Sequence, residues 1–201
     1  MTPPLIAAWL AAHPDLTTVG RPELYALFAQ MGLDTGAEIG VERGDNAAQM
    51  LEANPRLSLL CVDPWLAYKE YRDYRALSRL NRYYDLAQQA VAPYGKRCRL
   101  VRAFTMDAVR EVDPGSLGFC YIDGNHEFDY AMTDIIEWSR RVRSGGIVAG
   151  HDYCTLPGRR VQVIEAVTAY RQAHRIRDFW VVGGQCPNEV RVPASWFWVK
   201  P

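Results

Sequence analysis

The stretch from Ala37 to Gly44, Ala-Glu-Ile-Gly-Val-Glu-Arg-Gly, decides how the rest of the chain is organised. It places one acidic residue, Glu38, inside a short apolar run and then sets Gly40 and Gly44 four positions apart. The apolar run at 33–39 predicts a buried strand, and the residues after Gly44 predict a helix. Glycines in a strand-to-helix turn let the backbone approach a ligand closely, because no Cβ intervenes. The spacing is not the G-x-G-x-x-G of dinucleotide-binding enzymes.

Length and charge restrict the class of protein. We expect one domain over residues 1–201, a length sufficient for a sizeable core. The 23 basic and 23 acidic side chains balance, which indicates no nucleic-acid or anionic-membrane partner. The apolar run at 5–12 is too short to span a bilayer and lacks the basic flank of a signal peptide. Five cysteines without a C-x-x-C pair indicate a reduced, cytoplasmic protein.

Apolar runs alternate with helical patterns along the chain. Strands are expected at 33–39, 57–62, 99–103, 117–122 and 147–150, and runs at 179–182 and 196–199 predict an antiparallel pair. Helices are expected at 3–13, 22–32, 45–53, 105–112, 128–143 and 160–174, with Ser144-Gly145-Gly146 ending the fifth of them. The alternation predicts an α/β fold with a doubly wound, mostly parallel seven-stranded sheet whose last strand is antiparallel.

Polar residues fall where the parallel strands are expected to end. Gly40, Asp63, Asp123 and the pair His151-Asp152 follow four of the five apolar runs, and ligands of doubly wound sheets bind at these carboxyl ends. Asp63 can accept two hydrogen bonds from the ribose hydroxyls of a nucleoside that lies across the glycine turn. The alternative is a cap or turn residue before a proline.

Three further residues are candidates for a nucleoside site, each with a structural alternative. Trp65 can stack on an adenine or only cover the end of the sheet. Thr105 can face the edge of the adenine or cap the helix that it begins. Glu38 is a charge in a buried run and needs partners, which either the backbone N–H groups of the turn or a positively charged ligand would supply.

A second block of polar residues follows the fourth expected strand. Residues 121–127 are Tyr-Ile-Asp-Gly-Asn-His-Glu, and residues 145–153 are Gly-Gly-Ile-Val-Ala-Gly-His-Asp-Tyr. In the strand order 3-2-1-4-5 the fourth and fifth strands are neighbours, which brings Asp123 beside His151 and Asp152. Such ligands can hold a divalent cation or place a general base near an acceptor hydroxyl. His126 is a second candidate base, and for each histidine the alternative is a structural role.

The segment at 66–92 combines aromatic and basic side chains. It contains Tyr68, Tyr71, Tyr74, Tyr83 and Tyr84, interleaved with Arg72, Arg75, Arg79 and Arg82. The pattern predicts a helix that either covers one edge of the sheet, closes as a lid over the cofactor and acceptor, or forms the contact between two subunits of a homodimer.

The motif at 38–44 resembles motif I of the class I S-adenosylmethionine-dependent methyltransferases, E/D-x-G-x-x-x-G. With the blocks I-D-G-x-H and G-G-x-x-x-x-H-D-Y, the chain from about residue 36 to 153 is similar to the type 24 methyltransferase family. That family is related at greater distance to the metal-dependent catechol and macrolide-sugar O-methyltransferases. The resemblance implies a cofactor site at Glu38, Gly40, Gly44 and Asp63.

The resemblance also implies a metal site. In the metal-dependent relatives, magnesium is bound by an acid at the position of Asp123 and by an acidic or amide-bearing pair at the positions of His151 and Asp152. This chain departs from the pattern at His151, since histidine is a poorer ligand for magnesium than a carboxylate and is better suited to manganese.

We therefore expect transfer of a methyl group from S-adenosylmethionine to a small-molecule acceptor, at oxygen. The expected site residues are His126, His151 and Asp152 for catalysis; Glu38, Gly40, Gly44, Asp63, Trp65, Thr105 and Asp123 for the cofactor; and Asp123, His151 and Asp152 for a magnesium or manganese ion. One alternative is an NAD(P)-dependent oxidoreductase, disfavoured by the missing third glycine, and another is a nucleoside-binding module without catalysis. The sequence does not name the acceptor, which the segments 66–92 and 153–195 would line.

Overall fold

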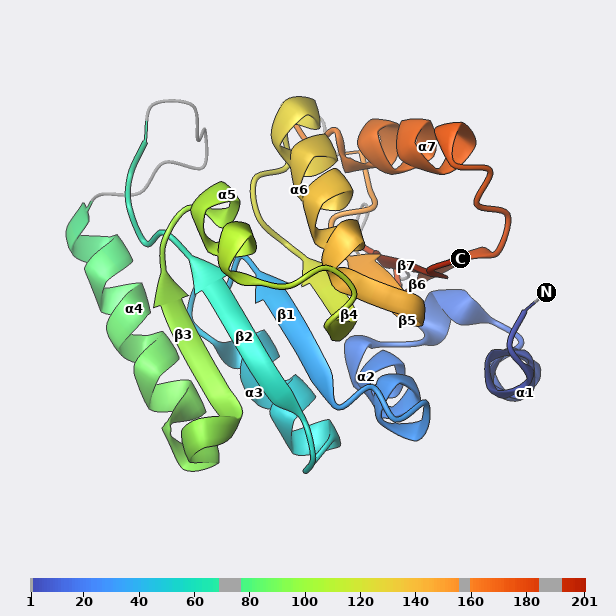
Figure 1. The fold of residues 1–201 in the computed structure, drawn as a ribbon, viewed down its shortest axis with the longest axis horizontal. Helices are drawn as coiled ribbons and strands as arrows, with labels where there is room; N and C mark the ends of the chain where they lie inside the picture. The colour runs from blue at the N-terminus through green and yellow to red at the C-terminus, as the bar shows by residue number, and fades with distance from the viewer. Residues whose placement is uncertain (1, 69–76, 156–159, 185–192) are drawn as a thin grey trace.

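Seven strands form one mixed sheet in the computed structural model of the chain, which describes residues 2–68, 77–155, 160–184 and 193–201 (Figure 1). The order across the sheet is β3 (Cys98–Arg102), β2 (Ser58–Asp63), β1 (Thr35–Ile39), β4 (Leu117–Ile122), β5 (Val142–Gly150), β7 (Ser195–Val199) and β6 (Phe179–Val182). Strands β1 to β5 pair in parallel, whereas β7 is antiparallel to both β5 and β6. The predicted strand order, doubly wound sheet and antiparallel last strand are confirmed.

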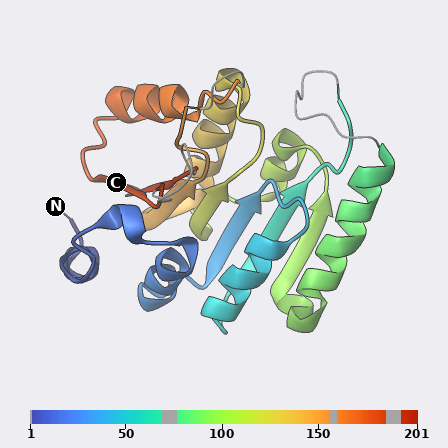
Figure 2. The same ribbon diagram turned by 180° about the vertical axis from the view of Figure 1, so that it is seen from behind.

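Helices cover both faces of the sheet (Figures 1 and 2). One face packs against α1 (Pro4–Ala12), α2 (Arg21–Gln30), α3 (Asp45–Ala53) and α4 (Leu77–Val91). The other packs against α5 (Thr105–Ala108), α6 (Phe128–Arg141) and α7 (Val163–Ala173). Short 3₁₀ helices occupy Leu16–Thr18, Ala92–Arg97 and Val109–Glu111. Each face has its own buried apolar cluster, so the sheet is the middle of three layers.

Alternation along the central strands assigns each side chain to one of these two layers. In β1, Ala37 and Ile39 belong to the cluster under α5, α6 and α7. Glu38 lies between them in sequence and therefore points to the opposite layer, where its side chain is fully buried. In β4, Tyr121 points to the layer of Glu38, while Asp123 follows the strand at its carboxyl end. The acid of the glycine motif is thus a core residue on the side of α2 and α3.

The end of α6 and the start of β5 differ from the sequence-based expectation. The helix was expected to continue to residue 143 and to stop at the Ser-Gly-Gly sequence, but it ends at Arg141 and β5 begins directly at Val142. Leu117 pairs with Val142 and Phe119 pairs with Ile147, so β5 bulges between its two paired positions. The glycines therefore accommodate an irregularity inside a strand instead of ending a helix, a role that glycine often has in sheets.

The expected helix at 66–92 is only partly present. Residues 64–68 have no regular structure, and α4 begins at Leu77. The predictions for Tyr71, Arg72, Tyr74 and Arg75 lie outside the described residues. At the other end of the chain, α7 begins at Val163, three residues later than expected. Among the residues that the structure describes, no helix has the length and apolar character needed to cross a membrane.

Candidate active site

The glycine turn requires its glycines for backbone conformation and for close packing. Gly40 and Gly44 have φ angles of 87° and 81°, in the left-handed region that side chains disfavour. A Cβ on Gly40 would lie 2.0 Å from the carbonyl oxygen of Asp123. A Cβ on Gly44 would lie 3.0 Å from the Cα of Ala87 in α4. The turn is therefore closely packed between the end of β4 and the helix that follows β2.

Asp63 holds this turn through its carboxylate. Its Oδ2 accepts hydrogen bonds from the backbone N–H groups of Val41 and Glu42, both at 3.0 Å, and its Oδ1 accepts one from Trp65 at 2.7 Å. Burial raises the pKa of Asp63, and the three N–H donors oppose that shift. Because a carboxylate has about four acceptor positions, roughly one remains for a ligand hydroxyl, against the two bonds expected from the sequence.

Trp65 is turned into the protein. It has a positive φ of 40°, its side chain is 1% exposed, and its indole N–H donates to the carbonyl of Glu42 at 2.7 Å. Its ring contacts the ring of Tyr84 in α4, with centroids 4.8 Å apart. In this conformation neither face of the indole is open to a nucleobase, so the geometry favours the alternative of covering the end of the sheet.

The partners of the buried Glu38 carboxyl are other side chains. Its Oε1 accepts a hydrogen bond from Asn46 Nδ2 at 2.8 Å, and its Oε2 lies 3.8 Å from the Cys61 thiol, which donates to it. Asn46 Oδ1 in turn accepts from the hydroxyl of Tyr25 in α2. Burial raises the pKa of Glu38 to about 8, although the Asn46 bond acts in the opposite direction. Of the two alternatives, the backbone N–H groups of the turn do not supply these partners; Asn46, in the first turn of α3, binds Glu38 instead.

Thr105 also uses its side chain inside the protein. Its hydroxyl donates to Asp134 Oδ1 at 2.8 Å and accepts from the indole N–H of Trp138 at 2.7 Å, both in α6. Burial raises the pKa of Asp134 to about 7, opposed by the bond from Thr105. The hydroxyl is therefore directed toward α6, and it caps no helix.

Four polar side chains converge where β4 and β5 end. His126 Nε2 lies 3.0 Å from Asp152 Oδ2 and 3.9 Å from Asp123 Oδ1. His151 Nδ1 lies 3.4 Å from the same Asp152 oxygen and 3.9 Å from the same Asp123 oxygen. We call Asp123, His126, His151 and Asp152 the strand-end cluster. The structure thus brings Asp123, His151 and Asp152 together, as expected from neighbouring strands, and adds His126 to them.

Backbone contacts fix the loops that carry the cluster. The His151 N–H continues the ladder by donating to the carbonyl of Ile122 at 3.0 Å, and Trp196 of β7 donates its indole N–H to the His151 carbonyl at 3.0 Å. Asp152 has a positive φ of 54°, a conformation that aspartate adopts more readily than most residues. The cluster therefore rests on paired strands and a defined turn.

Electrostatics make His126 and Asp152 an ion pair near neutral pH. Burial alone would lower the pKa of His126, but hydrogen bonds and charges from Asp123 and Asp152 outweigh it and raise that pKa to about 10. Burial would raise the pKa of Asp152, but the two imidazoles hold it well below its usual range. The imidazolium of His126 therefore balances two carboxylates that would otherwise repel each other.

The donor set of the cluster fits a divalent cation. Asp123, His126 and Asp152 each offer a ligand atom, and these atoms all lie within 4.8 Å of one another. Two carboxylates with imidazole nitrogen are typical of transition-metal ions more than of magnesium. The set differs from the expected Asp123, His151 and Asp152 in that His126 replaces His151, whose ring lies beside the same two carboxylates.

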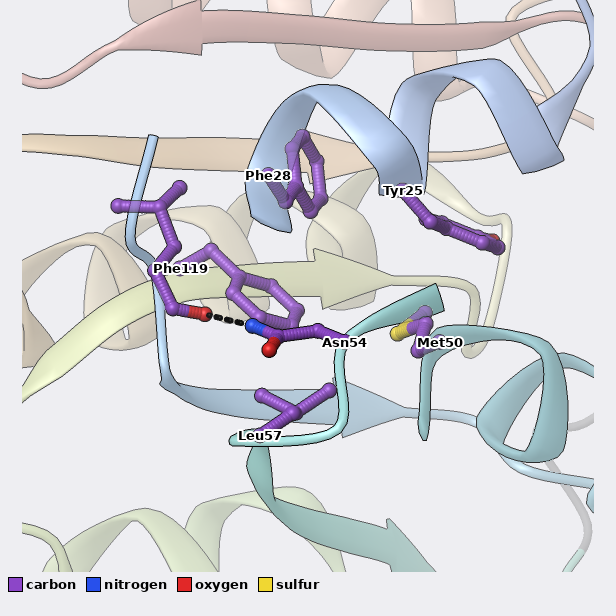
Figure 3. A pocket seen from close by; sticks show the side chains of 7 residues that line it. Tyr25, Phe28, Met50, Asn54, Leu57 and Phe119 are labelled. Atoms are coloured by element: carbon purple, nitrogen blue, oxygen red, sulfur yellow. Dashed lines mark hydrogen bonds between the residues drawn. The ribbon is translucent and has the colours of Figure 1, made fainter. Parts of the chain in front are cut away.

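The structure also contains a small cavity at the opposite end of the sheet, between α2, α3 and the starts of β1 and β2 (Figure 3). It is lined by Tyr25, Phe28, Leu33, Met50, Asn54, Leu57 and Phe119. Its volume of about 10 Å³ is at the lower limit for one water molecule. This cavity lies away from the strand-end cluster and is a packing void.

Sequence reasoning did not find the contribution of α2 to the site. Arg21 Nη1 lies 3.3 Å from Asn46 Oδ1 and 4.0 Å from Asp123 Oδ2. Tyr25, one turn later, bonds the same Asn46 oxygen. The helical spacing of these two residues is a local signal, but nothing local shows which later residues α2 faces.

The comparisons with known proteins agree with this fold and motif set. A family model described as a methyltransferase domain, of type 24, matches residues 37–153, more than half of the chain. The chain belongs to this methyltransferase family, as its motifs indicated. Its fold is that of the class I S-adenosylmethionine-dependent enzymes. A search of curated proteins finds none that matches the chain in sequence.

Solved structures show the same fold at low sequence identity. An O-methyltransferase from Bacillus cereus in complex with SAH superposes with a TM-score of 0.66 at 14% identity, covering 98% of this chain and 89% of that one. The O-methyltransferase TomG from Streptomyces achromogenes, in complex with SAM, gives 0.63 at 12% identity, covering 100% and 92%. The tRNA (m1A58) methyltransferase TrmI from Aquifex aeolicus gives 0.58 at 13% identity, covering 92% and 71%. Because one of these proteins acts on tRNA, the fold alone does not identify the acceptor.

Proposed function

We propose that the protein transfers a methyl group from S-adenosylmethionine to a hydroxyl oxygen of a small-molecule acceptor. The observation that carries this proposal is the strand-end cluster, where imidazole and carboxylate groups lie at the carboxyl ends of β4 and β5 beside the glycine turn. Methyl transfer is an in-line displacement, so the protein has to align donor and nucleophile and to remove the acceptor proton.

The cofactor would lie across the turn from Asp63 toward the cluster. Asp63 retains about one acceptor position for a ribose hydroxyl, and the positive φ angles of Gly40 and Gly44 give the turn its course at the end of the sheet. Neither Trp65 nor Thr105 keeps its expected cofactor contact in this proposal, because the side chains of both are engaged inside the protein.

The histidines of the cluster would have different roles. His126 holds its proton near neutral pH because its pKa is raised to about 10, so it keeps the two carboxylates together. We assign removal of the acceptor proton to His151, whose Nδ1 faces Asp123 and Asp152. A divalent cation on Asp123, His126 and Asp152 would take the place of the His126 proton, since only a neutral imidazole can bind a metal, and would polarise the acceptor oxygen and favour its deprotonated form. Manganese suits the nitrogen ligand better than magnesium does.

Charge also supports a small, uncharged or weakly charged acceptor. The chain has equal numbers of acidic and basic residues, which provides no general attraction for a polyanion such as RNA. A catechol, a phenol or a sugar hydroxyl is the class of acceptor that such a site would take.

Ligand-dependent stability and direct binding test the proposal. Thermal unfolding should shift upward with S-adenosylhomocysteine and not with NADH. A ligand at 100 times its Kd adds about 2.7 kcal/mol to the free energy of unfolding. Asp63→Ala should weaken the binding of S-adenosylhomocysteine by about 1–3 kcal/mol in calorimetric titration, because the ribose loses an acceptor and the turn loses two hydrogen bonds. Stabilisation by NADH alone would support the oxidoreductase alternative and overturn the proposal.

A further inference from the structure

Arg21 links the glycine turn to the strand-end cluster. It is the first residue of α2, and its side chain is 37% exposed. Nη1 bonds Asn46 Oδ1 at 3.3 Å, in the first turn of α3, and forms an ion pair with Asp123 Oδ2 at 4.0 Å. The start of α2 is fixed, because Glu23 Oε2 accepts a hydrogen bond from the Gly20 N–H at 3.0 Å. The guanidinium is therefore placed by a capped helix.

A chain of hydrogen bonds orients the partner of Arg21. Asn46 Nδ2 donates to Glu38, so its oxygen must face the other way, toward α2. There it accepts from both Tyr25 and Arg21. A guanidinium has five N–H donors in a planar fork, so its interactions with Asn46 and with the nearby Tyr121 leave donors for a carboxylate ligand. The 4.0 Å separation from Asp123 is too long for a hydrogen bond and does not consume them.

The charges at this edge of the sheet show what Arg21 can attract. Carboxylates dominate it, among them Asp63, Asp123 and Asp152. Among the residues that the structure describes, two other arginines reach the region from different sides. Arg43 pairs with Asp45 at 3.0 Å and is 51% exposed, and Arg102 donates to the Trp65 carbonyl and to Asn81 on the side of β3. A negatively charged group between the turn and β4 would therefore meet Arg21.

S-adenosylmethionine has such a group at the end opposite its adenosine. This step rests on the proposed function, in which the ribose lies at Asp63 on the β2 side of the turn and the transferable methyl group faces the cluster. The third substituent of the sulfonium is the amino-acid chain, which then extends on the side of α2 and α3. We propose that Arg21 binds the carboxylate of this amino-acid chain, and thereby selects cofactor forms that retain it.

Three nucleosides separate this role from a structural one. S-adenosylhomocysteine has the carboxylate; decarboxylated S-adenosylhomocysteine lacks only that group; and 5′-methylthioadenosine lacks the whole amino-acid portion. The wild-type protein should bind the first at least tenfold more tightly than the second in calorimetric titration. In Arg21→Ala this preference should fall to less than threefold, because S-adenosylhomocysteine weakens while the other two change little. Arg21→Lys should keep part of the preference, since lysine retains the charge without the fork.

Arg56→Ala is the control, because Arg56 is an exposed arginine that pairs with Asp34 at the opposite end of the sheet. It should leave all three affinities within twofold. If Arg21→Ala weakened all three ligands equally, Arg21 would only hold α2 in place, and the proposal would be wrong. An unchanged preference for the carboxylate in Arg21→Ala would overturn it as well. Failure of the wild-type protein to bind any of the three nucleosides would instead contradict the proposed function.

Discussion

At the scale of single residues, the glycine motif is held by buried polar side chains that the motif itself does not contain. Asn46 and Cys61 bind Glu38, and Asp63 binds the backbone of the turn. A buried polar group without such partners would cost about 1–3 kcal/mol, so each partner stabilises the turn by its presence. On the proposed function, the affinity for a cofactor therefore depends also on Asn46 and Cys61, which would not touch it.

The first prediction concerns Glu38 and pH. Because burial raises the pKa of Glu38 to about 8, the folded protein keeps a proton that the unfolded chain releases above its ordinary pKa near 4.5. Stability should therefore fall as pH rises between these values. Between pH 5.5 and pH 8.5, Glu38 should lower the free energy of unfolding by about 3 kcal/mol, at 1.36 kcal/mol per pKa unit. In Glu38→Gln most of this fall should disappear, as measured by urea unfolding at both pH values.

The exposed Glu165 of α7 provides the control, since Glu165→Gln should show the wild-type dependence on pH. The raised pKa of His126 also makes stability fall with rising pH, but this effect is the same in the wild type, Glu38→Gln and Glu165→Gln. The difference between Glu38→Gln and the wild type thus isolates Glu38. Identical slopes would mean that the Glu38 carboxyl is ionised in the folded protein at neutral pH.

The second prediction concerns the cluster. With radiolabelled S-adenosylmethionine and a panel of catechols, phenols and sugars, His151→Ala should lower turnover by about 10²–10⁴-fold, the usual effect of a general base. Its affinity for S-adenosylhomocysteine should stay within twofold. His174→Ala, at the end of α7, is the matched control and should be active. EDTA should abolish the wild-type activity, and manganese should restore more of it than magnesium does.

Both the EDTA test and the activity of His151→Ala can contradict the roles assigned to the cluster. Activity that is insensitive to EDTA would remove the cation and leave the histidines as the acid–base groups. Full activity of His151→Ala would exclude this residue as the base.

At the scale of elements, α4 packs against the turn because Gly44 has no side chain. A Cβ on Gly44 would lie 3.0 Å from Ala87 Cα and 3.2 Å from its carbonyl oxygen, and backbone atoms move only with the whole helix. The helix that follows β2 thus has a fixed contact with the turn, while the aromatic pair of Trp65 and Tyr84 packs beside it. Helix α4 covers this side of the site, so its position is coupled to the conformation of the glycine turn.

The third prediction compares two glycines that both have a positive φ. Gly32 has a φ of 66°, and a Cβ added to it would meet nothing within 4 Å, so Gly32→Ala should cost only the strain, about 1–2 kcal/mol. Gly44→Ala adds the collision with α4 and should cost about 1–3 kcal/mol more, which urea unfolding can measure. It should also weaken the binding of S-adenosylhomocysteine. Equal losses for the two variants would show that α4 shifts freely.

The elements also show what could be predicted from the sequence. The apolar periods gave the five parallel strands and placed Asp63, Asp123 and the His151-Asp152 pair at their ends, because strand ends are marked by local patterns. The end of α6 was missed because a glycine pair has the same local appearance in a strand bulge and at a helix terminus. The side-chain directions of Trp65, left open between stacking and covering the sheet, and of Thr105 could not be predicted. They depend on Tyr84, Asp134 and Trp138, which are 19 to 33 residues distant in the sequence.

At the scale of the whole molecule, the sheet consists of a parallel part and an added antiparallel pair. Strand β1 lies between β2 and β4, whereas β6 is joined to the sheet through β7. Packing on both faces protects the central strands, and an edge strand with one neighbour opens more easily. The site is carried by β1, β2, β4 and β5, so it lies in the part of the sheet with the most neighbours.

The fourth prediction follows from this difference. In native-state hydrogen exchange, amides of β1 and β4 should exchange only through global unfolding, while those of β6 should exchange through a smaller opening that leaves the centre intact. Mass spectrometry of peptides covering 35–39, 117–122 and 179–182 measures this. Equal protection of all three segments would indicate that the sheet opens as one cooperative unit.

The position of β7 between β5 and β6 also has a consequence for synthesis on the ribosome. Chains fold from the N-terminus as they are made, so β1 to β5 can assemble while the residues of β7 are still to come. Until residues 195–199 emerge, the outer edge of β5 presents unpaired N–H and C=O groups, and β6 has been made without its partner. An open edge of this kind is a template for pairing with another chain. For a nascent copy of this protein, the period between the translation of β5 and that of β7 is therefore when it is most exposed to aggregation.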